Sequence, residues 1–146
     1  MVFPIDSAGT SVAISPDARF VAVGSEDGVM RIWDVATGTL VSRLKGHGER
    51  VCSLAFTPDG KGLLSCSEDE TLKYWEFSVA LSDTHQTVMS HSNTVNSVAI
   101  SHDGQWIVSG SGDCGVQFWD GHGRTHLMLQ GHHAEGTPFP ASLLIV

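Results

Sequence analysis

The stretch LLSCSEDETLKYWEF, residues 63–77, holds an aspartate, Asp69, six positions before a tryptophan, Trp75. Two further stretches repeat this spacing: VAVGSEDGVMRIWD with Asp27 and Trp33, and IVSGSGDCGVQFWD with Asp113 and Trp119. The aspartates lie 42 and 44 residues apart along the chain, and the tryptophans keep the same intervals. The sequence therefore contains three copies of one unit.

Each copy carries the pattern of four β-strands. The first strand alternates small or polar with apolar residues, as half-buried strands do, in SVAIS (11–15), CSLAFT (52–57) and NSVAIS (96–101). A turn follows in SPDA, TPDG and SHDG, then two apolar strands joined by a tight turn, ending FVAVG/VMRIW, LLSCS/TLKYW and WIVSG/VQFW. A more exposed fourth strand completes each copy in TLVSRLK, QTVM and THLML. Helical periodicity is absent, so the chain is predicted to be all-β.

The first turn has one departure from its copies. Glycine suits the last position of TPDG and SHDG because that position favours a left-handed backbone. Ala18 stands there in the first copy. A positive φ at Ala18 would store about 1 kcal/mol of strain.

A period of about 40–45 residues is typical of β-propeller blades, each a four-stranded sheet. The predicted fold is a partial β-propeller of about three antiparallel blades that does not close into a ring. Closed propellers need about four to eight blades, and blades cover one another face to face. Two apolar faces would thus stay open, which predicts an oligomer, an aggregate or a ring completed by further blades or another chain.

The copies closely resemble the WD-repeat family over residues 9–133. The matching motifs are the Trp-Asp pairs Trp33-Asp34 and Trp119-Asp120, the variant Trp75-Glu76, the Gly-His pairs 46–47 and 131–132, and Ser90-His91. The resemblance places repeats at 9–45, 46–89 and 90–130, after an irregular lead (1–8) and before an aborted fourth repeat and irregular tail (131–146).

The same resemblance implies a hydrogen-bonded tetrad of His, Ser, Asp and Trp in each blade. The second copy supplies His47, Ser65, Asp69 and Trp75, and the third supplies His91, Ser109, Asp113 and Trp119. In the first copy Val23 and Ile5 replace Ser and His, so only Asp27 and Trp33 remain. Such a chain lets each buried polar atom find a partner, and each atom left without one costs about 1–3 kcal/mol. The first blade is expected to be the loosest.

Within the family, the details resemble the Groucho/Tup-type transcriptional corepressors of fungi. The segments that carry this likeness are SPDARFVAVGSEDGVMRIWD, SGSGDCGVQFWD and HLMLQGHH. The resemblance implies a non-catalytic scaffold that binds proteins or peptides, including DNA-bound regulators, on the upper face of the propeller. Its partner-binding positions would be Glu26, Arg50, Cys52, Glu68, Thr94, Asn96 and Gly112. A WD-repeat adaptor that recognises substrates in a ubiquitin-ligase complex is the alternative.

The composition limits which classes of partner and which cellular compartments are expected. Eight Lys and Arg against sixteen Asp and Glu give a net charge of −8, which disfavours direct contact with nucleic acid. No segment has the length and hydropathy of a membrane span. The three cysteines show no CxxC spacing and lie in apolar runs, which favours buried thiols in a reducing compartment, nucleus or cytoplasm.

Three patterns suggest chemistry that the repeat explains better. The Ser-His-Asp sets resemble a hydrolase triad, but their periodic repetition points to a structural role. GSGDCG (110–115) matches the dinucleotide-binding GxGxxG, yet a strand follows it where that motif needs a helix. The histidines of GHGRTHLMLQGHH (His122, His126, His132 and His133) lack the further ligands of a metal site. No catalytic residue, cofactor or metal is predicted.

Overall fold

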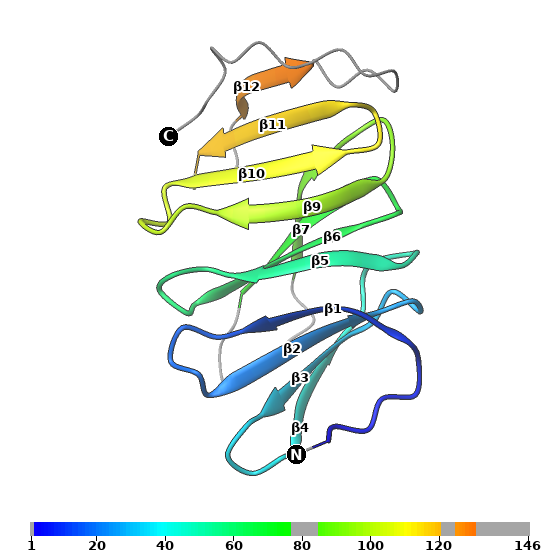
Figure 1. Cartoon of the computed structure of the whole chain (residues 1–146), viewed down its shortest axis with the longest axis vertical. Coiled ribbons are helices and arrows are strands. Elements are labelled where there is room, and N and C mark those ends of the chain that lie inside the picture. Colours follow the sequence, from blue (N-terminus) through cyan, green and yellow to red (C-terminus); the bar gives the residue numbers. More distant parts are fainter. Residues whose placement is uncertain (1, 77–84, 121–124, 131–146) are drawn as a thin grey trace.

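Three four-stranded antiparallel sheets make up the chain (Figure 1), and the computed structural model describes residues 2–76, 85–120 and 125–130. Within each sheet the strands follow one another in chain order. Blade 1 consists of β1 (Gly9–Ile14), β2 (Phe20–Ser25), β3 (Met30–Asp34) and β4 (Leu40–Leu44). Blade 2 consists of β5 (Val51–Phe56), β6 (Gly62–Ser67), β7 (Thr71–Glu76) and β8 (His85–Ser90). Blade 3 consists of β9 (Val95–Ile100), β10 (Trp106–Ser111), β11 (Gly115–Asp120) and β12 (Thr125–Gln130). The predicted all-β class and the predicted strands are confirmed.

The turn between the first two strands of each blade is built by its aspartate. In blade 1 the Asp17 carboxylate accepts hydrogen bonds from the Ser15 hydroxyl (2.6 Å) and from the Arg19 amide (3.0 Å). The last turn residue is left-handed in all three copies, with φ of 57° at Ala18, 71° at Gly60 and 72° at Gly104. The expected strain at Ala18 is therefore present in the fold.

The first three strands of each sheet pair in the same register, whereas the shift between the third and fourth strands falls at Leu72/Lys73 in blade 2 and at Ile32/Trp33 and Phe118/Trp119 in blades 1 and 3. Val23 faces Arg31 across β2 and β3 as Ser65 faces Lys73 in blade 2, and Ser109 faces Gln117 in blade 3. A register shift interrupts the first strand of every blade near its start, at Gly9/Ser11, Val51/Ser53 and, in the third blade, opposite Gly110/Ser111. Equivalent positions can thus be compared directly.

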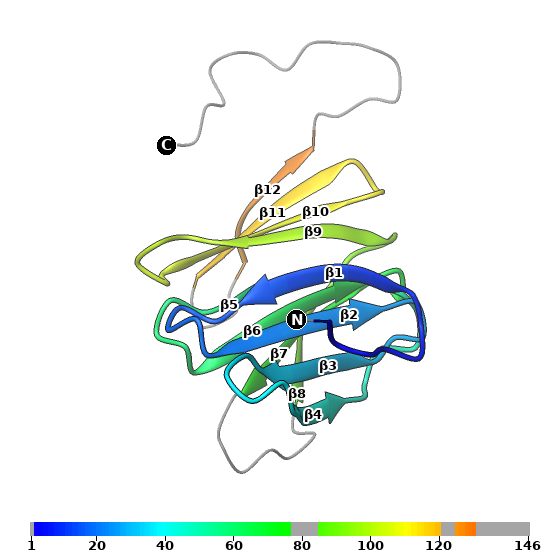
Figure 2. The ribbon, with the colours of Figure 1, turned by 60° about the horizontal axis from the view of Figure 1, so that its bottom comes forward.

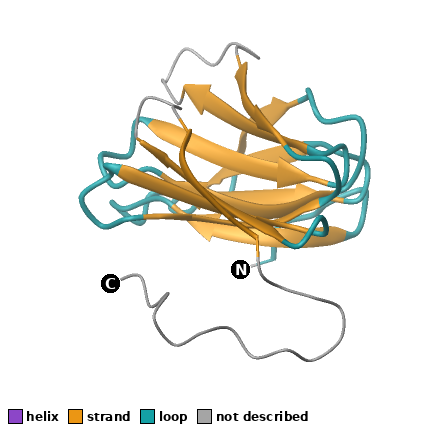
Figure 3. Cartoon of the chain, turned by 90° about the horizontal axis from the view of Figure 1, so that it is seen from above, coloured by secondary structure: helices purple, strands orange, loops and turns teal. Residues whose placement is uncertain are grey.

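The sheets stack face to face, with the first strands β1, β5 and β9 side by side (Figures 1 and 2). Viewed from above, the connecting loops lie at the two ends of the strands (Figure 3). Two apolar cores fill the junctions. The junction of blades 1 and 2 buries Phe20, Ala22, Met30, Ile32, Leu44, Val51, Leu54, Phe56, Leu63 and Trp75. The junction of blades 2 and 3 buries Leu64, Cys66, Leu72, Val95, Val98, Ile107 and Trp119.

The described sheets do not close into a ring, as predicted. On the outer face of blade 1, Val12 and Ile14 are 66% and 62% exposed. Trp106 of blade 3 is 39% exposed. The predicted aborted repeat and tail at 131–146 lie outside the described residues.

One expectation about the cysteines is wrong. Cys66 is buried and Cys52 is half-buried, but Cys114 is exposed. Cys114 has a positive φ of 64° in the β10–β11 turn, where its side chain points away from the sheet interior. Burial raises the pKa of the Cys66 thiol to about 12, so this thiol stays protonated.

Candidate functional site

In blade 2 the predicted tetrad residues meet in one hydrogen-bonded chain. The His47 Nδ1 atom donates to Asp69 Oδ2 at 2.8 Å, since an ionised carboxylate can only accept. The Ser65 hydroxyl lies 2.6 Å from His47 Nε2 and accepts the indole N–H of Trp75 at 2.7 Å. Ser65 and Trp75 are almost completely buried. The chain therefore connects the β4–β5 loop to two inner strands of the blade.

The Asp69 carboxylate is the anchor of this chain. Burial by itself would raise its pKa, but hydrogen bonds from Thr71 and His47 outweigh burial and hold the pKa below its ordinary value. Thr71 donates both its hydroxyl (2.6 Å) and its amide (3.0 Å), and the Gly48 amide adds a further bond at 3.1 Å. Asp69 thus stays ionised while it fixes the β6–β7 turn and the β4–β5 loop.

Blade 3 repeats the arrangement with slightly longer distances. His91 lies 3.1 Å from Asp113 through Nδ1 and 2.8 Å from Ser109 through Nε2. The Trp119 indole donates to Ser109 at 3.2 Å. Burial acts to raise the Asp113 pKa, but hydrogen bonds from the Gly115 amide and from His91 outweigh burial and hold the pKa below its ordinary value.

Blade 1 holds its turn aspartate by different chemistry. Arg31 is 2% exposed, and its Nη2 atom pairs with Asp27 at 2.9 Å and with Asp6 at 2.7 Å. Its Nη1 atom donates to the Ser25 hydroxyl at 3.2 Å. A guanidinium with several donors therefore takes the place of the missing imidazole and holds the Asp27 pKa below its usual range.

Three buried polar atoms of blade 1 lack a hydrogen-bond partner within the described residues: Ser11 Oγ, Arg31 Nε and Trp33 Nε1. Trp33 Nε1 is buried without a hydrogen-bond partner, because Val23 stands where Ser65 and Ser109 accept the equivalent indole N–H. Phe3 packs on the Trp33 ring, with centroids 5.3 Å apart. The indole N–H of Trp33 therefore loses its acceptor, while Arg31 restores the anchor at Asp27, and the loosest-blade expectation stays a prediction.

The tetrads share the hydrogen-bonding arrangement of a hydrolase triad, in which His lies between Asp and Ser. What separates them from a triad is burial. Ser65 and Ser109 are both 0% exposed, and each hydroxyl accepts an indole N–H. A substrate has no path to either oxygen, which favours a structural role.

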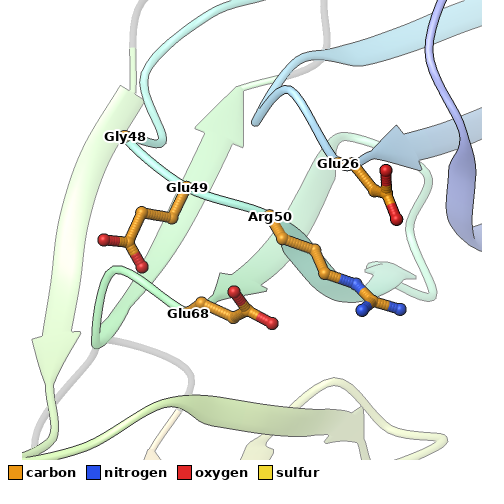
Figure 4. Close-up of a pocket in the computed structure, with 5 residues that line it drawn as sticks. All are labelled: Glu26, Gly48, Glu49, Arg50 and Glu68. Atoms are coloured by element: carbon orange, nitrogen blue, oxygen red, sulfur yellow. The ribbon is translucent and has the colours of Figure 1, made fainter.

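The upper face of the stack carries a separate polar site. We define the upper face as the rim formed by the β2–β3, β6–β7 and β10–β11 turns and the β4–β5 and β8–β9 loops. At the junction of blades 1 and 2, a pocket of about 460 Å³ opens on this rim (Figure 4). Its lining residues are Glu26, Gly48, Glu49, Arg50 and Glu68.

Close backbone packing brings these loops together. Gly28 has φ of 76°, and a side chain there would lie 2.6 Å from the His47 carbonyl oxygen and 2.8 Å from that of Glu49. The β2–β3 turn therefore presses directly on the β4–β5 loop, which sets Glu26 near Arg50. The Glu68 amide donates to the Arg50 carbonyl at 3.0 Å, which adds the third loop.

The structure brings only some of the predicted upper-face residues into this pocket. Glu26, Arg50 and Glu68 line it, whereas Cys52 sits half-buried at the register shift of β5. Thr94 and Gly112 pair through a backbone bond of 2.9 Å on the rim of blade 3, and Asn96 is exposed on β9. Thr94 and Gly112 lie on the rim and Asn96 lies on β9 beside it, and none of the three lines the pocket.

Sequence reasoning missed three contributors. Gly48 and Glu49 line the pocket, and Arg31 replaces the tetrad histidine. A signal for Arg31 existed, because it stands two positions before Trp33 on a strand that alternates toward the interior. Gly48 and Glu49 had no comparable signal, since only the packing of two blades makes them neighbours of Glu26.

We next consider metal-ligand clusters and membrane-spanning helices among the described residues. Over residues 2–76, 85–120 and 125–130, no three His, Cys, Asp or Glu side chains converge to hold a metal ion. Of the clustered histidines, His122, His132 and His133 and the His126 side chain lie outside the described parts. In the same ranges, no helix is long and apolar enough to cross a membrane.

Comparison with known proteins identifies the family. The WD domain, G-beta repeat family matches residues 7–34, 38–76 and 82–120. The chain therefore belongs to the WD40 family. A computationally designed protein, Ika4, has a similar crystal structure, with a TM-score of 0.77 and 27% identity, covering 90% of this chain and 78% of that one.

Three relatives share segments of the sequence. Nuclear distribution protein PAC1 of Coccidioides posadasii is 48% identical over 64 residues, which are 44% of this chain and 13% of that protein. DDB1- and CUL4-associated factor 13 of Dictyostelium discoideum is 40% identical over 73 residues, 50% of this chain and 16% of that one. Nuclear distribution protein nudF of Aspergillus flavus is 40% identical over 75 residues, 51% and 16%. The chain thus spans a small part of the length of these relatives, and their names do not single out the Groucho/Tup type.

Proposed function

We propose that the chain is a non-catalytic scaffold that binds a peptide segment of a partner protein at the pocket between blades 1 and 2. WD40 blades are rigid supports for loops, and the fold alone does not fix the partner. The observation that carries the proposal is the convergence of three loops on one polar pocket. Among the described lining residues, Glu26, Glu49 and Glu68 are the carboxylates and Arg50 is the cation.

The charges of the pocket indicate the chemistry of the segment. No described residue forms an ion pair with Arg50, so its charge is available to a ligand. Three carboxylates against one guanidinium leave the site acidic. A segment with a basic side chain for the glutamates and an acidic group for Arg50 would complement both.

The test is selection of peptides from a random displayed library, followed by affinity measurement on the 146-residue chain. Selected peptides are expected to carry Lys or Arg, and Glu68→Lys and Arg50→Glu should each weaken binding about tenfold or more. Glu76→Lys, an exposed change at the end of β7 away from the pocket, is the control. Peptides that bind all variants equally would contradict the upper-face site. Hydrolase activity lost in Ser65→Ala would contradict the non-catalytic role.

The class of partner has two candidates. The sequence resemblance to Groucho/Tup-type corepressors favours DNA-bound regulators in the nucleus. The relative whose name states association with DDB1 and CUL4 suits the alternative, an adaptor in a ubiquitin-ligase complex. Capture of DDB1 by the chain, tested with purified protein, would favour the adaptor over the corepressor.

A further inference from the structure

The outer face of blade 1 repeats a face that is buried elsewhere in the same chain. Val12 and Ile14 occupy the positions of Leu54 and Phe56 in blade 2, because each pairs with the equivalent β2 or β6 residue. Leu54 and Phe56 are 7% and 9% exposed under blade 1, whereas Val12 and Ile14 are 66% and 62% exposed. Blade 1 therefore presents an exposed apolar surface along β1, while Phe3 already covers Trp33, the counterpart of Trp75 on the same face.

The outer face of blade 3 repeats the other half of that junction. By register its residues Trp106, Val108, Val116, Phe118 and Leu129 correspond to Phe20, Ala22, Met30, Ile32 and Leu44. All five counterparts in blade 1 are buried against blade 2. In blade 3 Trp106 is exposed and the other four are half-buried. The chain thus carries both halves of one junction, at opposite ends of the stack.

We propose that a second copy of this chain docks head to tail, with blade 3 of each copy covering blade 1 of the other. An interface between two different faces generates a ring when the rotation closes. Two copies of three blades give a ring of six, within the range of about four to eight blades that propellers adopt. Three copies of the three described blades would exceed that range, so the ring proposed for this 146-residue chain is a closed dimer with two equal junctions.

The match of side chains selects a second copy over an unrelated partner, since every apolar position of the internal junction named above recurs as an apolar residue. One position differs. Val51 packs against Gly24 inside the chain, where a side chain on Gly24 would come within 2.6 Å of Val51. Gly9 takes the place of Val51 on the open face, where an added Cβ would lie 3.1 Å from Ile5 Cδ1. Gly110 takes the place of Gly24, and an added Cβ there would have no atom within 4 Å. The junction between copies is therefore less filled than the internal ones and is expected to dissociate first on dilution.

The test is the molar mass of the 146-residue chain in the micromolar range, measured by light scattering after size exclusion. The expected mass is about 31 kDa, twice the 15.6 kDa of one chain. Val12→Glu and Trp106→Glu should each give the monomer mass, because each places a charge in both junctions. Lys61→Glu, in the exposed β5–β6 turn, is the control and should stay dimeric. Far-UV circular dichroism checks that every variant keeps its strands.

Mixing the Val12→Glu and Trp106→Glu variants distinguishes the loss of one docking face from unfolding of the chain. The open face of the Trp106→Glu chain and the blade 3 face of the Val12→Glu chain are both intact, so an equimolar mixture should recover one junction and the mass of about 31 kDa. A monomeric parent chain, a dimer that neither substitution disturbs, a polydisperse series, or a mixture that stays monomeric would each overturn the proposal. Glu68→Lys should leave the mass unchanged, so failure of the peptide site and failure of the dimer are distinguishable.

Discussion

At the scale of single residues, the turn between the first two strands offers a natural comparison. Ala18 and Gly60 stand at the same turn position with φ of 57° and 71°. A left-handed backbone costs a residue with a Cβ about 1–2 kcal/mol, and glycine loses part of that advantage through its freedom in the unfolded chain. An added Cβ at Gly60 would meet only Pro16, at 3.9 Å, so sterics with neighbours do not decide the outcome.

We therefore expect Ala18→Gly to stabilise the protein by about 0.5–1 kcal/mol, because it relieves the positive φ. The reciprocal change Gly60→Ala should destabilise by a similar amount. Denaturant titration of both variants checks the pair. Equal and same-signed effects would show that the backbone conformation is not the cause.

The buried serines lead to a second expectation. Ser65→Ala removes the hydroxyl that the Trp75 indole N–H and His47 Nε2 share, and the loss of these bonds should cost about 1–3 kcal/mol. Val23→Thr does the opposite in blade 1, because a hydroxyl of similar volume can accept the unpaired N–H of Trp33. It should stabilise by about 1 kcal/mol. Thermal unfolding measures both, and a destabilising Val23→Thr would argue that Trp33 N–H is solvated.

How much of the site the sequence predicts depends on whether its signal is local. The turn aspartates, glycines and tetrad members recur at fixed spacing, so their positions could be read from the chain. The Arg31 anchor uses another residue type at another position and breaks the repeat that guided the prediction. The pocket lining is less predictable still, since Glu26 and Glu49 meet only when two blades pack.

At the scale of the element, the same turn aspartate is held by two different kinds of side chain. Blades 2 and 3 hold their turn aspartate with an imidazole, and blade 1 holds it with a buried guanidinium. In all three the pKa of the aspartate is lowered in the folded state. Stabilisation from a lowered pKa is present above the unfolded pKa and is lost as the pH falls through the folded one.

We expect the free energy of unfolding to fall steeply between about pH 5 and about pH 2, as these carboxylates take up protons. Asp69→Asn should lower stability at neutral pH and flatten the acid limb, because the titrating group of blade 2 is gone. Ser65→Ala is the matched control, since it breaks the same tetrad but keeps the carboxylate and should keep the slope. An unchanged acid limb in Asp69→Asn would contradict the assignment.

At the scale of the whole molecule, stability is the sum of blades and of the junctions between them. Ile32 fills the junction of blades 1 and 2, and Leu72 fills that of blades 2 and 3, both at 0% exposure. Truncating either side chain should cost about 2–5 kcal/mol.

The location of the effect should differ between the two. Leu72→Ala should speed amide hydrogen exchange in β9–β11 more than in β1–β3, and Ile32→Ala should do the reverse. Exchange followed by mass spectrometry resolves the two regions. Uniform acceleration in both variants would show that the three blades open as one unit.

The order of strands in the stack was predictable because each unit is local and repeats. What the repeat could not supply is the pairing of faces. Leu54 and Val12 stand at equivalent positions, yet one is buried and the other is exposed, since burial depends on which blade stands beside them.

The repeated strand order also limits which gene deletions and duplications can preserve the sheets. All three matched family segments end with the third strand of a sheet, and the second and third begin just before β4 and β8, so these two are offset from the sheets by one strand. Loss of residues 34–75 would join Trp33 to Glu76 and let β8 replace β4 beside β3, leaving every surviving sheet with four members. We therefore expect deletions or duplications of one full period to keep four strands in each sheet, whereas changes of other lengths would break a sheet.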